Sequence, residues 1–174
     1  MTKELWIPRK DGFKRALDYM KGRSDGTIKS IQTPWSKFND ATTNGIEWNT
    51  LNVIGGRPGA GKTLIKDQII REAFSLNPDT QFRVLEFSFE MIMQTSCLRD
   101  FSASLGKSYK YLCSAESNKL TNEELLQCYE FAKQKVHYPI DTVEQPCTVN
   151  EMRDIVDKYI NEYQTKTIIT VDHS

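Results

Sequence analysis

The sequence predicts an α/β fold in which a parallel β-sheet is flanked by helices. Three observations lead to this prediction. Strand-like and helix-like segments alternate along the chain, a glycine-rich phosphate loop stands between a strand and a helix, and an aspartate follows a β-branched strand. With 174 residues, the chain is long enough for one domain with a hydrophobic core.

The charge distribution gives no overall signal for a nucleic-acid partner, because 23 basic residues balance 23 acidic ones. Residues 1–40 nevertheless carry nine basic and five acidic side chains, a net +4, which leaves −4 for the remainder. This basic arm is either a solvated leader or a contact for phosphate or for an acidic partner.

Several classes of protein are excluded. No apolar run approaches the roughly 20 residues of a membrane-spanning helix, and the N-terminus has no secretory signal, so no membrane is involved and we expect a cytoplasmic protein. The four cysteines lack the spacing of metal ligands, and we expect them to be reduced and mostly buried. They are Cys97, Cys113, Cys128 and Cys147.

The first predicted element is a short helix over residues 12–21, because four apolar residues recur with helical spacing. These are Phe13, Ala16, Leu17 and Met20. Asp11 or Gly12 is expected to cap its start, and Gly22 to end it. The helix either packs on its own domain or docks on a neighbouring subunit.

Residues 22–34 contain three chain breakers and are expected to form a linker. The predicted organisation is therefore an N-terminal arm over residues 1–34, which includes the helix, followed by a globular core over residues 35–174.

The core pattern alternates between strands and helices, which implies right-handed crossovers and a parallel sheet. The strands are expected at residues 51–54, 82–88, 136–142 and 167–171. Helices are expected from residue 62 to about 76, from 91 to about 105, from the capping box at 121–124 to about 135, and after the capping box at 148–151. Gly106 ends the second of these helices, and capping boxes that begin at Thr121 and Thr148 open the last two. In the last helix six apolar residues are expected to be buried: Met152, Ile155, Val156, Tyr159, Ile160 and Tyr163.

The phosphate loop fits the pattern G-x-x-x-x-G-K-[ST] at every fixed position. Its residues are Gly56, Arg57, Pro58, Gly59, Ala60, Gly61, Lys62 and Thr63. Glycines let backbone N–H groups approach a phosphate, and the following helix points its positive N-terminus at the same anion. Lys62 adds a point charge at the β- and γ-phosphates, and the Thr63 hydroxyl is a candidate ligand for Mg²⁺.

Two carboxylates near strand ends are candidates for the chemistry of a bound nucleotide. Asp172 follows the last strand, where open α/β sheets bind ligands, and is expected to hold Mg²⁺ directly or through water. Glu90 follows the 82–88 strand and is expected to face the γ-phosphate as general base. Its alternative is a plain helix N-terminal acid, and Glu86 lies mid-strand, where a paired or edge position is expected.

Four other polar residues stay open at this point. Arg57 and Arg99 are candidates for phosphate or partner contacts, or for solvated and packing roles. His137 is expected to be structural, and His173 is assigned no catalytic role.

The order of motifs resembles the RecA-like C-terminal domain of DnaB-type replicative helicases, the hexameric superfamily 4 group, over roughly residues 26–174. The phosphate loop is similar to that family's A-R-P-x-x-G-K-T form, with Gly56 in place of alanine. The segment 87–91 looks like its F-S-L-E-M motif, Arg99 falls where the family has an arginine, and Asp172 matches its Walker B aspartate. Further similar segments are 31–35, Phe38, Asn39, Gly45, 138–140 and 151–153, and the Asp172–His173 pair is more like the phage and mitochondrial branch.

The resemblance implies a RecA-like P-loop NTPase that uses ATP and Mg²⁺, assembles as a homohexameric ring and moves on single-stranded DNA. It implies Glu90 as catalytic base, Lys62 and Asp172 as catalytic partners, and the helix at residues 12–21 as a linker that docks on the adjacent subunit. A primase or a loader is a possible further partner.

The family's N-terminal domain and everything after Walker B are not seen in the sequence, so we expect an incomplete, truncated ATPase core. Such a chain should bind nucleotide weakly at best and should not unwind DNA. The alternatives are another RecA-like ATPase, of the recombinase or clock type, and a non-catalytic nucleotide-binding subunit.

Overall fold

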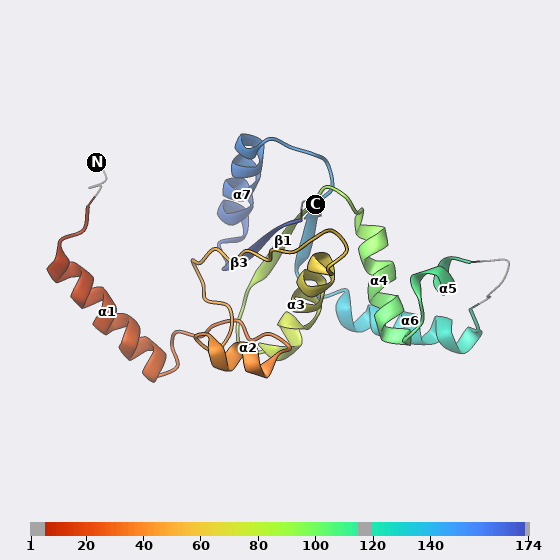
Figure 1. The fold of residues 1–174 in the computed structure, drawn as a ribbon, viewed down its shortest axis with the longest axis horizontal. Coiled ribbons are helices and arrows are strands. Elements are labelled where there is room, and N and C mark those ends of the chain that lie inside the picture. The colour runs from red at the N-terminus through yellow and green to blue at the C-terminus, as the bar shows by residue number, and fades with distance from the viewer. Residues whose placement is uncertain (1–5, 115–119, 173–174) are drawn as a thin grey trace. The chain divides into compact units, whose positions relative to one another are not determined.

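A computed structural model of the chain describes residues 6–114 and 120–172 (Figure 1). The chain consists of two compact units, Met1–Val53 and Ile54–Ser174. No helix in the described ranges is long and apolar enough to cross a membrane. His173, to which the sequence assigned no catalytic role, lies outside the described residues.

The first unit contains α1 (Arg9–Ser24), α2 (Ser36–Ala41) and an antiparallel bridge between Ile31 and Ile46. Ile31 is the centre of its small core and is only 1% exposed. Two buried polar side chains satisfy each other beside it. The Thr33 backbone N–H and hydroxyl both donate to Asn39 Oδ1, at 3.0 and 2.8 Å, and Asn39 Nδ2 donates to the Thr33 carbonyl at 2.9 Å.

Helix α1 confirms the predicted helix but is longer, and its predicted caps are wrong. Asp11 and Gly12 lie inside it, because Pro8 occupies the N-cap position, where proline's missing N–H costs nothing. Gly22 does not end it. The chain folds back after Ser24, so that the Ile28 N–H donates to the Gly22 carbonyl at 2.8 Å and the Ile28 side chain covers the glycine.

The second unit is built on a three-stranded sheet. Strand β1 (Arg83–Ser88) lies between β2 (Ile140–Val143) and β3 (Thr167–Asp172), and both neighbours are parallel to it. The helices of this unit are α3 (Lys62–Leu76), α4 (Met93–Leu105), α5 (Tyr109–Cys113), α6 (Asn122–Lys135) and α7 (Val149–Tyr163). This arrangement confirms the predicted α/β class with a parallel sheet.

Helices α3 and α7 cover opposite faces of the sheet (Figure 1). Successive strand residues point to opposite faces, so contacts identify which face is which. Lys66 of α3 reaches Glu86, whereas Tyr159 of α7 reaches Arg83. The even-numbered residues of β1 therefore face α3 and the odd-numbered ones face α7. Because β3 pairs with β1 in parallel register, with Ser88 beside Asp172, the even-numbered residues of β3 face α3 as well.

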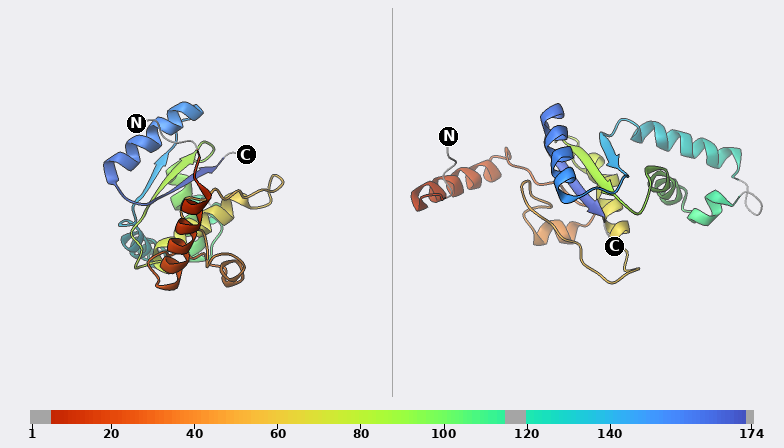
Figure 2. Two further views of the ribbon diagram at one scale, coloured as in Figure 1. Left: turned by 90° about the vertical axis from the view of Figure 1, so that its left-hand side faces the viewer. Right: turned by 90° about the horizontal axis from the view of Figure 1, so that it is seen from above.

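Helices α4, α5 and α6 lie beyond the β2 edge of the sheet, as Figure 2 shows in its right-hand view. Helix α4 ends at Gly106, which has the left-handed φ of 63° typical of a glycine C-cap. Helix α5 was not predicted from the sequence. It has only five residues and no apolar repeat, and its N-cap is the Ser108 hydroxyl, which accepts from the Tyr111 N–H.

Helix α7 begins with the predicted capping box, but its predicted burial is wrong. None of its residues is fully buried, and Ile160 and Tyr163 are 41% and 37% exposed. Helix α7 covers a sheet of only three described strands, so its flanks remain open to solvent. A polar contact also attaches it to the sheet. Arg83 Nε donates to the Tyr159 hydroxyl at 2.9 Å and Arg83 Nη2 pairs with Asp141 at 2.8 Å.

The Tyr159 hydroxyl in turn donates to the Asp141 carboxylate. Burial, together with this hydrogen bond, raises the pKa of Tyr159 to about 12. The phenol therefore stays protonated at neutral pH. It can act as a donor to Asp141 while its oxygen accepts from Arg83.

Two predicted strands need correction. Residues 51–54 form no strand, and Leu51 and Val53 are 90% and 82% exposed, because this segment pairs with no strand in the described part of the chain. Strand β2 begins at Ile140, not at Val136. The first residues of the predicted strand instead continue from α6, with the Val136 N–H donating to the Ala132 carbonyl at 2.8 Å.

The expected burial of the cysteines is also wrong. Cys97 and Cys113 are exposed, and Cys128 and Cys147 are half-buried. The first three lie on or near the open α4–α6 group, where little of the described chain covers them.

Gly45 should be intolerant of a side chain, because its φ is 118° and an added Cβ would lie 2.1 Å from the Ile31 carbonyl oxygen. Gly45→Ala should lower the free energy of unfolding by roughly 3–4 kcal/mol, through backbone strain and loss of the Ile31–Ile46 bridge. Urea unfolding followed by circular dichroism measures this change.

Gly26→Ala is the matched control, because Gly26 also has a positive φ, 77°, but faces open space. It should cost about 1 kcal/mol. Equal losses in the two variants would contradict the steric argument.

Candidate functional site

The phosphate loop closes directly onto the N-terminus of α3, which begins at Lys62. Gly59 and Gly61 have left-handed φ values of 77° and 89°, and the Ala60 N–H donates to the Arg57 carbonyl at 3.1 Å. A Cβ added at Gly59 or Gly61 would meet nothing within 4 Å, so these glycines are needed for backbone conformation and not for space inside the protein. The loop is a tight turn, and its residues 55–60 are exposed.

Lys62 lies over this loop. Its ammonium group donates to the Gly56 carbonyl at 3.3 Å, and a Cβ at Gly56 would lie 3.5 Å from the Lys62 Cγ and 3.3 Å from the Ala60 Cβ. The lysine thus stays close to the loop through a bond to a neutral carbonyl. Together with the N–H groups of the first helical turn, it gives a site of positive potential for an anion.

Asp172 is connected to the same helix from the sheet. It is the last residue of β3, and its Oδ2 lies 3.7 Å from the Lys66 ammonium, which stands one helical turn beyond Lys62. The Asp172 side chain is only 14% exposed. The structure therefore brings the predicted Walker B aspartate to α3 and to the side of the sheet that the phosphate-loop helix covers.

The two candidate glutamates have different environments. Glu86 is buried in the middle of β1 and forms an ion pair with Lys66 at 3.0 Å, which confirms the expectation of a paired, mid-strand acid. Glu90 lies two residues beyond the end of β1 and is exposed. This position is compatible with both readings of the sequence, so its role as general base stays a prediction.

Arg57 is exposed on the loop, and Arg99 is half-exposed on α4. Arg99 Nη1 lies 3.9 Å from Asp67 of α3, so this arginine connects α4 to the phosphate-loop helix. Its predicted contact with phosphate or a partner is untested.

Sequence reasoning missed Lys66 and Asp67. Lys66 pairs with Asp67 and Glu86, both at 3.0 Å, as well as with Asp172. Burial alone would lower the pKa of Lys66, but the charges of Glu86 and Asp67 outweigh it and raise that pKa above its ordinary value. The available signal was Glu86 itself, because an acid inside a buried strand requires a cation that the sequence must supply elsewhere.

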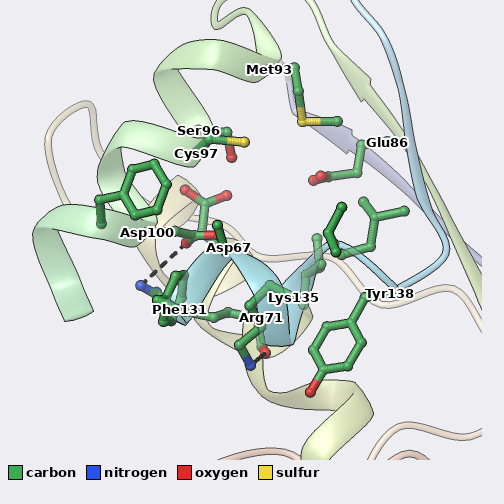
Figure 3. A pocket seen from close by; sticks show the side chains of 15 residues that line it. Asp67, Arg71, Glu86, Met93, Ser96, Cys97, Asp100, Phe131, Lys135 and Tyr138 are labelled. Carbon is green, nitrogen blue, oxygen red and sulfur yellow. Dashed lines mark hydrogen bonds and ion pairs between the residues drawn. The ribbon is translucent and has the colours of Figure 1, made fainter. Parts of the chain in front are cut away.

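A separate cavity of about 330 Å³ opens between α3, α4, α6 and the sheet (Figure 3). Arg71 and Asp100 form an ion pair at its wall, at 3.4 Å, and burial raises the pKa of Asp100, which Arg71 offsets only in part. No residue of the phosphate loop contributes to the lining of this cavity. It is therefore distinct from the nucleotide site predicted from the sequence.

The residues of the loop and strand end fit a magnesium nucleotide. Around two left-handed glycines, Gly59 and Gly61, an added Cβ would meet no atom within 4 Å, so phosphate oxygens have room beside this backbone. The Thr63 hydroxyl and the Asp172 carboxylate supply hard oxygen ligands of the kind that Mg²⁺ prefers.

Comparison with known proteins agrees with this geometry. A family model described as the DnaB-like helicase C terminal domain matches residues 30–174. A solved structure whose title describes it as an ATPase domain superposes with a TM-score of 0.76 at 14% sequence identity. The superposition covers 96% of this chain and 57% of that one, so the chain spans little more than half of that structure. No curated protein sequence matches significantly.

The chain belongs to the DnaB-like helicase C-terminal domain family. This membership confirms the resemblance found in the sequence, and the structural match confirms the RecA-like α/β fold. The family membership favours a helicase-type ATPase core over the recombinase and clock-type alternatives.

Lys66→Met should be strongly destabilising, because Glu86 and Asp67 would both lose their ammonium partner in a buried setting. We expect a loss of roughly 3–5 kcal/mol in the free energy of unfolding, measured by urea denaturation. Lys66→Met combined with Glu86→Gln removes the charge of the buried strand acid as well and should recover part of the lost stability, while Asp67 keeps Arg99 as a partner. If the single variant were as stable as the wild type, the pair would not be a structural requirement.

Proposed function

As a member of this family, the chain is, we propose, the ATP-binding and ATP-hydrolysing core of a DnaB-like replicative helicase that moves on single-stranded DNA. The observation that carries the proposal is the phosphate loop, with left-handed Gly59 and Gly61, closed onto the N-terminus of α3. Backbone N–H groups of the loop and of the first turn of α3 bind the nucleotide phosphates.

The individual roles follow from chemistry and position. Lys62 leaves the Gly56 carbonyl and contacts the β- and γ-phosphates. The Thr63 hydroxyl and the Asp172 carboxylate hold Mg²⁺, which when bound neutralises charge on the phosphates. Glu90 accepts a proton at its carboxylate oxygen from the water that attacks the γ-phosphate. Its exposed position after β1 allows it to approach a nucleotide held by the loop.

A ring of identical subunits is the proposed assembly, and α1 is the element proposed to hold neighbours together. Its apolar residues Phe13, Leu17 and Met20 are 60%, 65% and 64% exposed. Several large apolar side chains exposed on one helix face are typical of an interaction site. The predicted arm over residues 1–34 thus remains our proposal for the contact between subunits, whereas a primase or a loader has no further support.

Nucleotide binding tests the function directly. Isothermal titration of the chain with magnesium ATP should show binding, and Lys62→Ala should weaken it at least tenfold because a phosphate-binding charge is lost. Lys133→Ala, which removes an exposed lysine from α6, is the matched control and should change nothing. If Lys62→Ala binds ATP as tightly as the wild type, the phosphate-binding role of Lys62 is wrong.

Hydrolysis separates the enzyme from the non-catalytic alternative. With single-stranded DNA present, Glu90→Gln should keep the ATP affinity of the wild type and lose at least a hundredfold in turnover, because the general base is gone. ATP binding without hydrolysis by the wild type would favour a non-catalytic subunit. If Glu86→Gln lost turnover and Glu90→Gln kept it, the general base would be Glu86 and not Glu90.

The docking role of α1 is tested by replacing its apolar face. The triple substitution Phe13→Ser, Leu17→Ser and Met20→Ser should convert an oligomer to a monomer in analytical ultracentrifugation and leave ATP affinity unchanged. The control replaces polar positions of the same helix, Lys14→Ser, Asp18→Ser and Lys21→Ser, and should keep the oligomer. An oligomer that survives the apolar substitutions would exclude this role for α1.

A further inference from the structure

One ammonium group, that of Lys66, gathers three carboxylates beside the phosphate-loop helix. Its Nζ lies 3.0 Å from Asp67 Oδ1, 3.0 Å from Glu86 Oε1 and 3.7 Å from Asp172 Oδ2. The four side chains are between 9% and 14% exposed, so water screens these charges little. Arg99 approaches only Asp67, at 3.9 Å, and is itself half-exposed.

The position of Lys66 follows from two periodicities. It stands four residues after Lys62, so the two lysines lie on one side of α3, one turn apart. Glu86 and Asp172 are even-numbered residues of β1 and β3, and therefore point from the sheet toward that helix. The ammonium group thus lies between the helix that begins at the phosphate loop and the strand that ends in the proposed metal ligand.

The three distances divide the carboxylates into two kinds. Asp67 and Glu86 are at hydrogen-bond distance and satisfy the ammonium group. Asp172, at 3.7 Å, is too far for a hydrogen bond but close enough for a strong charge interaction in a buried setting. Lys66 therefore attracts the Asp172 carboxylate without using its oxygen lone pairs, which remain available to another cation.

A purely structural ion pair would not need Asp172. Glu86 alone is a sufficient partner for a buried lysine, and a buried pair adds little net stability over an apolar one. The contact with Asp172 places the positive charge of Lys66 next to the proposed metal ligand. A metal ion bound to Asp172 would share this carboxylate with the Lys66 ammonium group, and the two positive charges would repel each other.

We propose that Lys66 is a positioning residue that serves as a resident counter-cation for Asp172 and weakens Mg²⁺ binding there. The inference rests on the proposed function, in which Asp172 holds the metal. Mg²⁺ usually binds through one or two carboxylates together with substrate phosphates. The negative phosphates of a nucleotide offset the repulsion from Lys66, so the metal is retained together with nucleotide and poorly without it.

The test measures the affinity of the complete chain for Mn²⁺ by electron paramagnetic resonance, with and without ADP. The variant is Lys66→Met with Glu86→Gln, which removes one positive and one negative charge and so keeps the net charge of the buried group. Without ADP it should bind Mn²⁺ roughly three- to tenfold more tightly than the wild type. The increase in affinity on adding ADP should be smaller in this variant than in the wild type.

The matched control is Arg71→Met with Asp100→Asn, which removes another ion pair between α3 and α4, at 3.4 Å, that does not involve Asp172. It should bind Mn²⁺ as the wild type does. A merely structural role for Lys66 would leave Mn²⁺ affinity unchanged or lower it, and either result in the Lys66–Glu86 variant overturns the inference. An equal effect of ADP on wild type and variant overturns the link to nucleotide.

Asp172→Asn separates this inference from the proposed function. If it weakens Mn²⁺ binding while the Lys66–Glu86 variant equals the wild type, only the role of Lys66 is wrong. If Asp172→Asn binds Mn²⁺ as well as the wild type, or if neither wild type nor variant binds it, the metal assignment is wrong as well. Binding by the variant alone supports the inference.

Discussion

The placement of the site depends on the ion pairs that Lys66 makes across the α3 face of the sheet. The helix begins at the phosphate loop, so the place where α3 packs decides where a bound anion would lie. Lys66 anchors that packing by its contacts with Glu86 of β1 and Asp172 of β3. An ammonium group in this position stays charged, because two close carboxylates outweigh its burial. The loop, the helix and the strand end are therefore held in one arrangement by electrostatics as much as by apolar packing.

On the opposite face of the sheet, a different charged residue of β1 likewise connects a neighbouring strand and a helix. Arg83 of β1 binds Asp141 of β2 and the hydroxyl of Tyr159, and its guanidinium stacks 3.6 Å from the ring centroid of Tyr163. Odd- and even-numbered strand positions thus direct charged side chains to opposite helices. Because β1 lies between the other two strands, both clusters pass through it, and its backbone is the common support of the two faces. This explains why apolar burial in β1 coexists with two charged residues, Arg83 and Glu86.

The sequence predicted best what is encoded locally. Both capping boxes form as expected, with the hydroxyls of Thr121 and Thr148 accepting from backbone N–H groups three residues on. The phosphate loop is equally local, since its glycines set their own turn. The contact between Lys66 and Glu86 joins residues twenty positions apart, and the sequence around Lys66 does not predict it. Position along the chain placed Asp172 at a strand end, but only the folded sheet reveals which cation it meets. The role of Glu90 as general base depends on a contact with nucleotide, so neither the sequence pattern nor the fold determines it.

The failed prediction at residues 51–54 has a physical cause that also explains the burial of the rest of the sheet. A strand is a property of paired backbones, and β-branched composition supplies only the propensity for pairing. Phe87 and Val171 show this clearly. They are register partners on the same face, yet Phe87 in the central strand is fully buried and Val171 in an edge strand is 51% exposed. Exposure follows the number of neighbouring strands more than the character of the side chain. Val53, with no strand beside it in the described residues, is 82% exposed for the same reason. An apolar pattern therefore predicts which segments can enter a sheet, whereas burial depends on neighbours that lie elsewhere in the chain or in a partner.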